Sequence, residues 1–252
     1  MKKRDGFSLI GILAGIASAA LLIVATIAIN NKSSQMTDFD DYDFYSVIKP
    51  TVDNGNIGDH IKGGDENAQV IIFEYADYQC PGCASINSKI NTALSKFDGK
   101  VAVVYRSMLL SYHQNGTAAA SAAEAAGLQG YWKPYADILF ANQREWEYAS
   151  PSERTVLFDT YFNEVTEYKG DIEKFHTDIT SEAVSKKINF DMGIAKRIDV
   201  SATPALYVEG QNIKWTEASA ITINGKVISW DKSIGDTEGL TKLFQDILDA
   251  KN

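Results

Sequence analysis

The stretch from Val70 to Cys83 reads VIIFEYADYQCPGC, and the rest of the chain is interpreted around it. Its first four residues, Val70 to Phe73, form an apolar run that predicts a short interior strand. Two cysteines follow, Cys80 and Cys83, and the sequence contains no others. A disulfide that closes so short a loop would restrict the unfolded chain by only about 2 kcal/mol. A purely structural staple is therefore a poor explanation of the pair.

The proline after Cys80 predicts that a helix begins there, because proline is favoured at the first helical position. Cys80 would then lie at the helix N-terminus, where free N–H groups and the helix dipole favour a thiolate and lower the thiol pKa. Cys83 would lie one turn further in and be less exposed. This difference suits a two-step exchange, in which Cys80 forms a mixed disulfide and Cys83 resolves it.

Three interpretations of the cysteine pair remain open from these residues alone. A C-x-x-C beside a strand–helix unit favours redox chemistry. Half of a zinc site is the main alternative, because zinc normally takes four ligands, but His60, His113 and His176 show no paired H-x-x-x-H spacing. An inert structural pair is the third. We expect neither a metal nor a cofactor.

The N-terminal segment predicts a membrane anchor. Residues 7–29 carry no charged side chain, and these 23 positions exceed the ~20 that a helix needs to cross a bilayer. A basic cluster at positions 2–4 precedes them, so the positive-inside rule predicts a cytoplasmic N-terminus and an extracytoplasmic remainder. The tripeptide Ala17-Ser18-Ala19 resembles a signal-peptide cleavage site, but the apolar residues that follow it favour an uncleaved anchor.

We divide the chain into three parts on composition. Residues 1–30 are the cytoplasmic N-terminus and the transmembrane anchor, residues 31–56 form a polar, acidic tether, and residues 57–252 form the folded domain. The hydrophobic content of 45% is sufficient for one sizeable core. The net charge of −9 argues against a nucleic-acid partner.

Local patterns predict the elements of the folded domain. Apolar residues recur at helical spacing over residues 84–97, and residues 101–105 form a second interior strand, so this unit should be a right-handed crossover between parallel strands. Helical patterns then fill an insertion at about residues 112–198. After it, Asn224-Gly225 predicts a type I′ hairpin, and a periodic apolar face after Asp236 predicts a final amphipathic helix.

This order of elements resembles the thioredoxin fold of the DsbA-like thiol–disulfide oxidoreductases, from about Asp59 to the C-terminus. The segments that carry the resemblance are DHIKG (59–63), EYADYQCPGC (74–83), VYR (104–106), AEAAGLQG (123–130) and ATPAL (202–206). The resemblance implies an α/β fold with a central mixed β-sheet and an inserted helical subdomain, preceded here by one N-terminal transmembrane helix.

The resemblance also implies roles for individual residues. It implies that Pro204 is cis and lies against the cysteines, and that the main chain of Thr203 receives an extended substrate. Glu74 occupies the place of a buried acid beneath Cys83, where it would accept the Cys83 proton, directly or through water. The alternative for Glu74 is an ordinary strand-end carboxylate in contact with solvent.

We therefore expect an extracytoplasmic, membrane-tethered enzyme that oxidises cysteines in exported proteins through Cys80 and Cys83. Its reoxidation would require a quinone-linked membrane partner, as the resemblance implies. Strongly oxidising members of the family place a histidine between the cysteines, whereas Pro81-Gly82 supplies no cation. The alternatives are a disulfide reductase or isomerase of the same fold, and a non-enzymatic peptide-binding or chaperone module.

Overall fold

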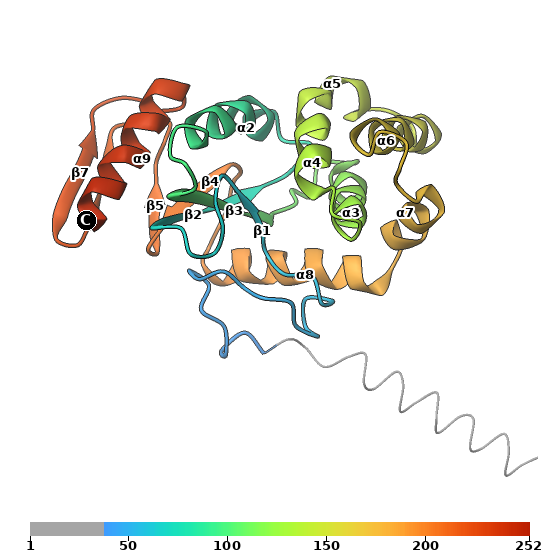
Figure 1. The fold of residues 1–252 in the computed structure, drawn as a ribbon, viewed down its shortest axis with the longest axis horizontal. Helices are drawn as coiled ribbons and strands as arrows, with labels where there is room; N and C mark the ends of the chain where they lie inside the picture. Colours follow the sequence, from blue (N-terminus) through green and yellow to red (C-terminus); the bar gives the residue numbers. More distant parts are fainter. Residues whose placement is uncertain (1–37) are drawn as a thin grey trace, which may run out of the picture. The chain divides into compact units, whose positions relative to one another are not determined.

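The strand that leads to the cysteines lies in the middle of the main β-sheet. The computed structural model describes residues 38–252 (Figure 1). In this part of the chain, β2 (Val70–Ala76) pairs in parallel with β3 (Val101–Ser107) and antiparallel with β4 (Ala205–Val208). The edges are β1 (His60–Lys62), beside β3, and β5 (Gln211–Ile213), beside β4, so the order is β1-β3-β2-β4-β5. The predicted parallel crossover and mixed sheet are confirmed.

Helices cover both faces of this sheet (Figure 1). Helices α2 (Pro81–Leu94) and α9 (Thr237–Lys251) pack on one face, and α8 (Glu182–Arg197) packs on the other. Successive side chains of a strand point to opposite faces, so Ile72 joins the core under α2 and α9, while Phe73 joins the core under α8. Because both faces are buried, β2 is apolar along most of its length rather than alternating.

A helical insertion separates β3 from β4, as the sequence predicted. Its elements before α8 are α3 (Gly116–Gly127), α4 (Trp132–Ala141), α5 (Gln143–Trp146), α6 (Pro151–Val165) and α7 (Ile172–Ile179). The expected capping box is present at the start of α6, where Ser150 accepts a hydrogen bond from the N–H of Glu153 and the Glu153 carboxylate accepts one from the N–H of Ser150. The aromatic and alanine side chains of the insertion form a core that also includes Tyr78, Cys80 and Cys83.

The C-terminal part follows local signals closely. Strands β6 (Ser219–Ile223) and β7 (Lys226–Trp230) form the predicted hairpin. Asn224 and Gly225 have φ angles of 49° and 78°, as a type I′ turn requires. Helix α9 begins after Asp236, whose side chain accepts the N–H of Gly239 at 2.7 Å. Asp236 is therefore the N-terminal cap of the last helix.

The predicted tether differs from the structure over residues 39–56, because they belong to the compact unit formed by Phe39–Asn252. Ile48 is buried, and the ring of Phe39 packs against Phe190 of α8 with centroids 5.3 Å apart. The carbonyl groups of Phe44 and Ser46 accept hydrogen bonds from the buried Arg106 in β3. Aromatic side chains scattered through an acidic segment therefore supply enough apolar contact to hold it on the domain.

The predicted membrane anchor at residues 1–30 lies outside the described residues. Among residues 38–252, the structure contains no helix with the length and apolar character needed to span a bilayer.

Candidate active site

The structure places Cys80 at the N-cap of α2, with Pro81 at the first helical position, as predicted. Both cysteines are free thiols. Cys83 is fully buried, and Cys80 keeps only 7% of its surface exposed. The expected difference in exposure is present but small, because the loop that contains Thr203 covers Cys80. The Cys80 Sγ lies 3.3 Å from the Thr203 carbonyl oxygen, to which it donates a hydrogen bond when the thiol is protonated.

The two thiols differ strongly in acidity. A hydrogen bond from the Cys83 thiol is the main factor that lowers the pKa of Cys80 to about 5. Burial opposes this decrease, while the side chain of Thr203 and the N–H groups of Gly82 and Cys83 add to it. Burial raises the pKa of Cys83 well above its ordinary value. At neutral pH Cys80 is therefore a thiolate and Cys83 remains a thiol that donates to it.

The Thr203–Pro204 peptide bond is cis, as the resemblance implied. Pro204 packs against the turn between the cysteines: a Cβ added to Gly82 would lie 3.1 Å from Pro204 Cδ and 3.7 Å from Cys80 Sγ. The absence of a side chain at Gly82 therefore leaves free the space between Pro204 Cδ and Cys80 Sγ. From the other side, the Trp215 indole N–H donates to the Pro204 carbonyl oxygen at 3.2 Å and holds this loop in place.

Glu74 is fully buried, so the alternative of a solvent-exposed strand-end carboxylate is wrong. Its Oε2 accepts a hydrogen bond from Lys62 Nζ at 2.9 Å, and the same ammonium donates to Asn87 Oδ1 at 2.9 Å. The negative charge of Glu74 is one of the factors that raise the pKa of Cys83. The Glu74 Oε1 is buried and has no hydrogen-bond partner among the described residues.

Sequence reasoning missed Lys62, because a lysine in a short strand is ordinarily exposed. The only signal for it was its place in the DHIKG segment. The structure leaves Lys62 only 1% exposed. Lys62 lies in β1 and Glu74 in β2, on opposite sides of β3, and the Lys62 ammonium pairs with the Glu74 carboxylate. A buried ammonium requires such a partner.

Two other buried charged residues have supporting roles in the scaffold. Asp77 is fully buried and accepts hydrogen bonds from the Gln79 N–H and from His113 Nδ1, both at 2.8 Å. It thereby shapes the loop before Cys80. Arg106 forms an ion pair with Asp59 at 2.7 Å and holds the segment before β1. Both arrangements are packing and loop-capping contacts.

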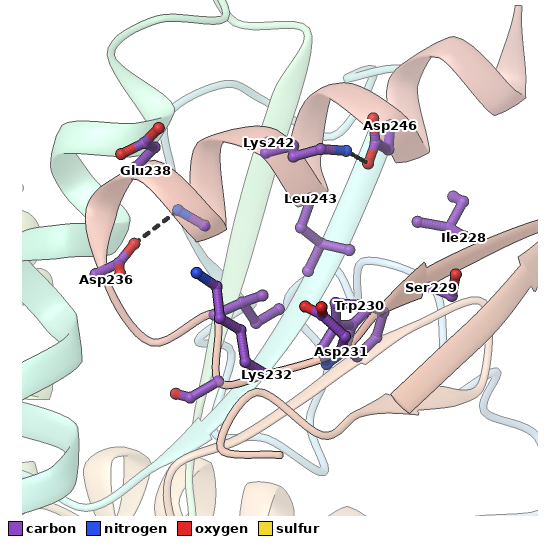
Figure 2. Close-up of a pocket in the computed structure, with 13 residues that line it drawn as sticks. Ile228, Ser229, Trp230, Asp231, Lys232, Asp236, Glu238, Lys242, Leu243 and Asp246 are labelled. Carbon is purple, nitrogen blue, oxygen red and sulfur yellow. Dashed lines mark hydrogen bonds and ion pairs between the residues drawn. The ribbon is translucent and has the colours of Figure 1, made fainter. Parts of the chain in front are cut away.

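A hollow of about 360 Å³ lies between β7 and the start of α9, and neither cysteine lines it (Figure 2). Asp236 in its wall caps α9, and Lys242 pairs with Asp246 one turn further along. These charges serve the helix itself, so we assign this hollow no part in thiol chemistry. Among residues 38–252, no group of three or more His, Cys, Asp and Glu side chains is placed to hold a metal ion.

A dithiol at a helix N-terminus, closed over by a cis-proline loop, defines a protein of the thioredoxin-fold class. The family model described as thioredoxin matches residues 56–240. The chain belongs to the thioredoxin family.

Solved structures with the same fold include BdbD, alpha-DsbA1 and a thioredoxin-like oxidoreductase. BdbD from Bacillus subtilis superposes with a TM-score of 0.59 at 18% identity, covering 81% of this chain and 98% of that one. Alpha-DsbA1 from Wolbachia pipientis has a TM-score of 0.56 at 20% identity, covering 77% and 92%. A thioredoxin-like oxidoreductase from Silicibacter pomeroyi gives 0.54 at 19%, covering 75% and 91%. The predicted resemblance to DsbA-like proteins is confirmed.

Curated relatives are similar to this chain over part of their length. The Na⁺/H⁺ antiporter NhaA of Herminiimonas arsenicoxydans is 29% identical over 207 residues, which is 81% of this chain and 30% of that protein. NhaA 1 of Mycobacterium sp. strain KMS is 30% identical over 168 residues, covering 65% and 26%. The chain thus spans less than one third of the length of these two relatives.

Proposed function

We propose that this chain is an extracytoplasmic thiol–disulfide oxidoreductase that forms disulfides in exported proteins through Cys80-Pro81-Gly82-Cys83. The observation that carries the proposal is the acidity of Cys80, whose pKa is lowered to about 5 at the head of α2 beside the Cys83 thiol. A thiol with a low pKa is a good leaving group, so a mixed disulfide between Cys80 and a substrate is readily opened by a second substrate thiolate.

In the oxidising cycle, a substrate thiolate attacks Cys80 Sγ in the Cys80–Cys83 disulfide. A bond forms between the two sulfurs, the Cys80–Cys83 bond breaks, and Cys83 leaves as a thiolate that takes up a proton. A second substrate thiolate then attacks the substrate sulfur of the mixed disulfide, and Cys80 leaves as a thiolate. Two electrons pass from the substrate to the protein, which is left as the dithiol.

Two further groups complete the proposed site. Glu74 is the group that would accept the proton of Cys83. Its carboxylate is buried, and its negative charge is one of the factors that raise the pKa of that thiol. Thr203 and Pro204 form the surface that receives an extended substrate chain. The buried Thr203 hydroxyl has no hydrogen-bond partner among the described residues when Cys80 is a thiol, so it can donate to the thiolate, whose formation its side chain favours.

The acidity of Cys80 also bears on the direction of electron flow. A pKa of about 5 lies between those of the active thiols in thioredoxin, about 7, and DsbA, about 3.5. The reduction potential should accordingly lie between about −270 and −120 mV. A value in this range favours oxidation of exported chains in a compartment where disulfides persist.

The proposed location follows from the apolar segment at residues 7–29, which would anchor the chain in the membrane with its domain outside. Returning to the disulfide form requires an oxidant, which we take to be a quinone-linked membrane protein. Tethering to the same membrane would raise the effective concentration of the domain near that partner.

The proposal is tested with Cys83→Ala in cells that export cysteine-containing proteins. Without the resolving thiol, mixed disulfides between Cys80 and substrates are expected to accumulate and to appear as reducible bands on non-reducing gels. Cys80→Ala is the matched control and should give none. If Cys83→Ala accumulates no mixed disulfide, exchange through Cys80 is refuted.

The state of the wild-type thiols in its own cells separates the oxidase from its nearest alternative. Acid trapping followed by thiol alkylation should find mostly the disulfide form. A mostly reduced protein would instead favour a reductase or isomerase that receives electrons from a membrane donor.

A further inference from the structure

Three buried amide side chains connect the loop before Cys80 to the helical insertion. They are Gln79 in the loop, Asn115 before α3 and Gln143 at the start of α5, with 4%, 5% and 6% of their surfaces exposed. Buried amides require partners for their donors and their acceptor.

Gln79 and Asn115 join the insertion to the loop by a hydrogen bond to each other and by bonds to the turn after α5. Gln79 Oε1 accepts the Asn115 N–H at 2.7 Å, and Gln79 Nε2 donates to the Glu147 carbonyl oxygen at 2.7 Å. Asn115 Nδ2 in turn donates to the carbonyl oxygens of Trp146 and Ala149, at 2.9 and 3.0 Å. The turn after α5 is thereby tied to the residue that immediately precedes Cys80.

Gln143 acts on Cys80 more directly. Its Nε2 donates to the carbonyl oxygens of Tyr78, at 2.7 Å, and Cys80, at 3.0 Å. One NH₂ group thus uses both of its hydrogens to hold the main chain on either side of Gln79. The Cys80 carbonyl oxygen also accepts the Ala84 N–H at 3.1 Å, the first main-chain hydrogen bond of α2. The peptide that begins this helix is therefore held by the helix and by Gln143 together.

We propose that Gln143 is a positioning residue that holds the main chain of Cys80 so that its sulfur faces the helix N-terminus and the Thr203 loop. This inference deepens the proposed function and rests on it. The Cys83 thiol and the N–H groups that favour the thiolate act over short distances, so a small rotation of the Cys80 peptide would weaken their hydrogen bonds. An amide suits this task because it donates two hydrogen bonds without placing a charge near the thiolate.

The test uses two substitutions of Gln143 with opposite chemistry. Gln143→Met keeps the length of the side chain and removes both donors. Gln143→Glu keeps the shape, but its carboxylate repels the two carbonyl oxygens and adds a negative charge beside Cys80. In the reduced full-length protein, the pKa of Cys80 is measured from thiolate absorbance against pH. Gln143→Met should decrease the thiolate fraction at acidic pH about tenfold, and Gln143→Glu should decrease it further.

Gln129 supplies a matched control within the insertion. Its side chain also bridges one residue, donating to the Asp171 carbonyl oxygen and accepting the Asp171 N–H, both at 2.9 Å. Gln129→Met and Gln129→Glu should leave the Cys80 titration unchanged. A purely structural role for Gln143 would lower the melting temperature without moving the Cys80 pKa.

The outcomes separate this inference from the proposed function. If wild-type Cys80 is acidic and folded Gln143→Met titrates like the wild type, the positioning role is refuted and the proposed function stands. If wild-type Cys80 titrates as an ordinary thiol, both are refuted. Should Gln143→Glu fail to fold, Gln143→Met alone decides, because it introduces no charge.

Discussion

The low pKa of Cys80 predicts that the reduced protein is less stable in acid. Comparison with Cys80→Ala measures how much of this loss comes from Cys80. The pKa falls from an ordinary value of 9.0 to about 5 on folding. Because the folded-state pKa is the lower one, the stabilisation is fully present above pH 9 and is lost as the pH falls through about 5. At neutral pH, two units above the folded-state pKa, it amounts to at most ~2.7 kcal/mol. Solvent screening at a partly accessible sulfur decreases it to about 1–2 kcal/mol.

The measurement is urea denaturation of the reduced wild type and of Cys80→Ala, at neutral pH and below the Cys80 pKa. Other titrating groups are common to both proteins, so their contributions cancel in the difference. The wild type should lose about 1–2 kcal/mol more than Cys80→Ala between the two pH values. An equal loss in both proteins would mean that folding does not stabilise a thiolate at Cys80, and the chemistry proposed for it would have no basis.

Three further predictions concern the scaffold and the redox centre. Arg106→Met should lower the free energy of unfolding by about 3–5 kcal/mol, because Lys187, 3.4 Å away, is then the cation left to balance the buried Asp59 carboxylate; a urea-measured loss below ~1 kcal/mol would contradict this. Gly193→Ala should loosen the N-terminal segment and expose it to limited proteolysis, since a Cβ there would overlap the Phe39 ring; unchanged cleavage rates would rule this out. Equilibration with glutathione should give a potential between about −270 and −120 mV, and a value at or beyond either end would disprove the intermediate acidity of Cys80.

Several elements were predictable because their causes lie within a few residues. The apolar run Val70–Phe73 forms β2, and the proline after Cys80 begins α2. Asn224-Gly225 turns the hairpin through positive φ angles that these residues tolerate. The cysteine spacing also predicts which thiol is acidic, because it follows from position along a helix.

Contacts between distant segments were not predictable in this way. Composition suggested a solvated tether for residues 39–56, yet these residues pack on α8, because a suitable apolar surface exists only after the chain has folded. Lys62 and Glu74 belong to strands that both flank β3, and their pairing depends on sheet order.

The sequence by itself determined the elements of the domain and the identity of the reactive dithiol, since hydrophobic period, turn chemistry and helix ends are local properties. The surroundings of that dithiol were decided only by the tertiary structure. Gln143 reaches the Cys80 carbonyl across 63 positions of the chain, and Thr203 reaches its sulfur across 123. No short-range sequence pattern predicts such contacts, because they form only when the insertion packs on the sheet and brings separate loops together.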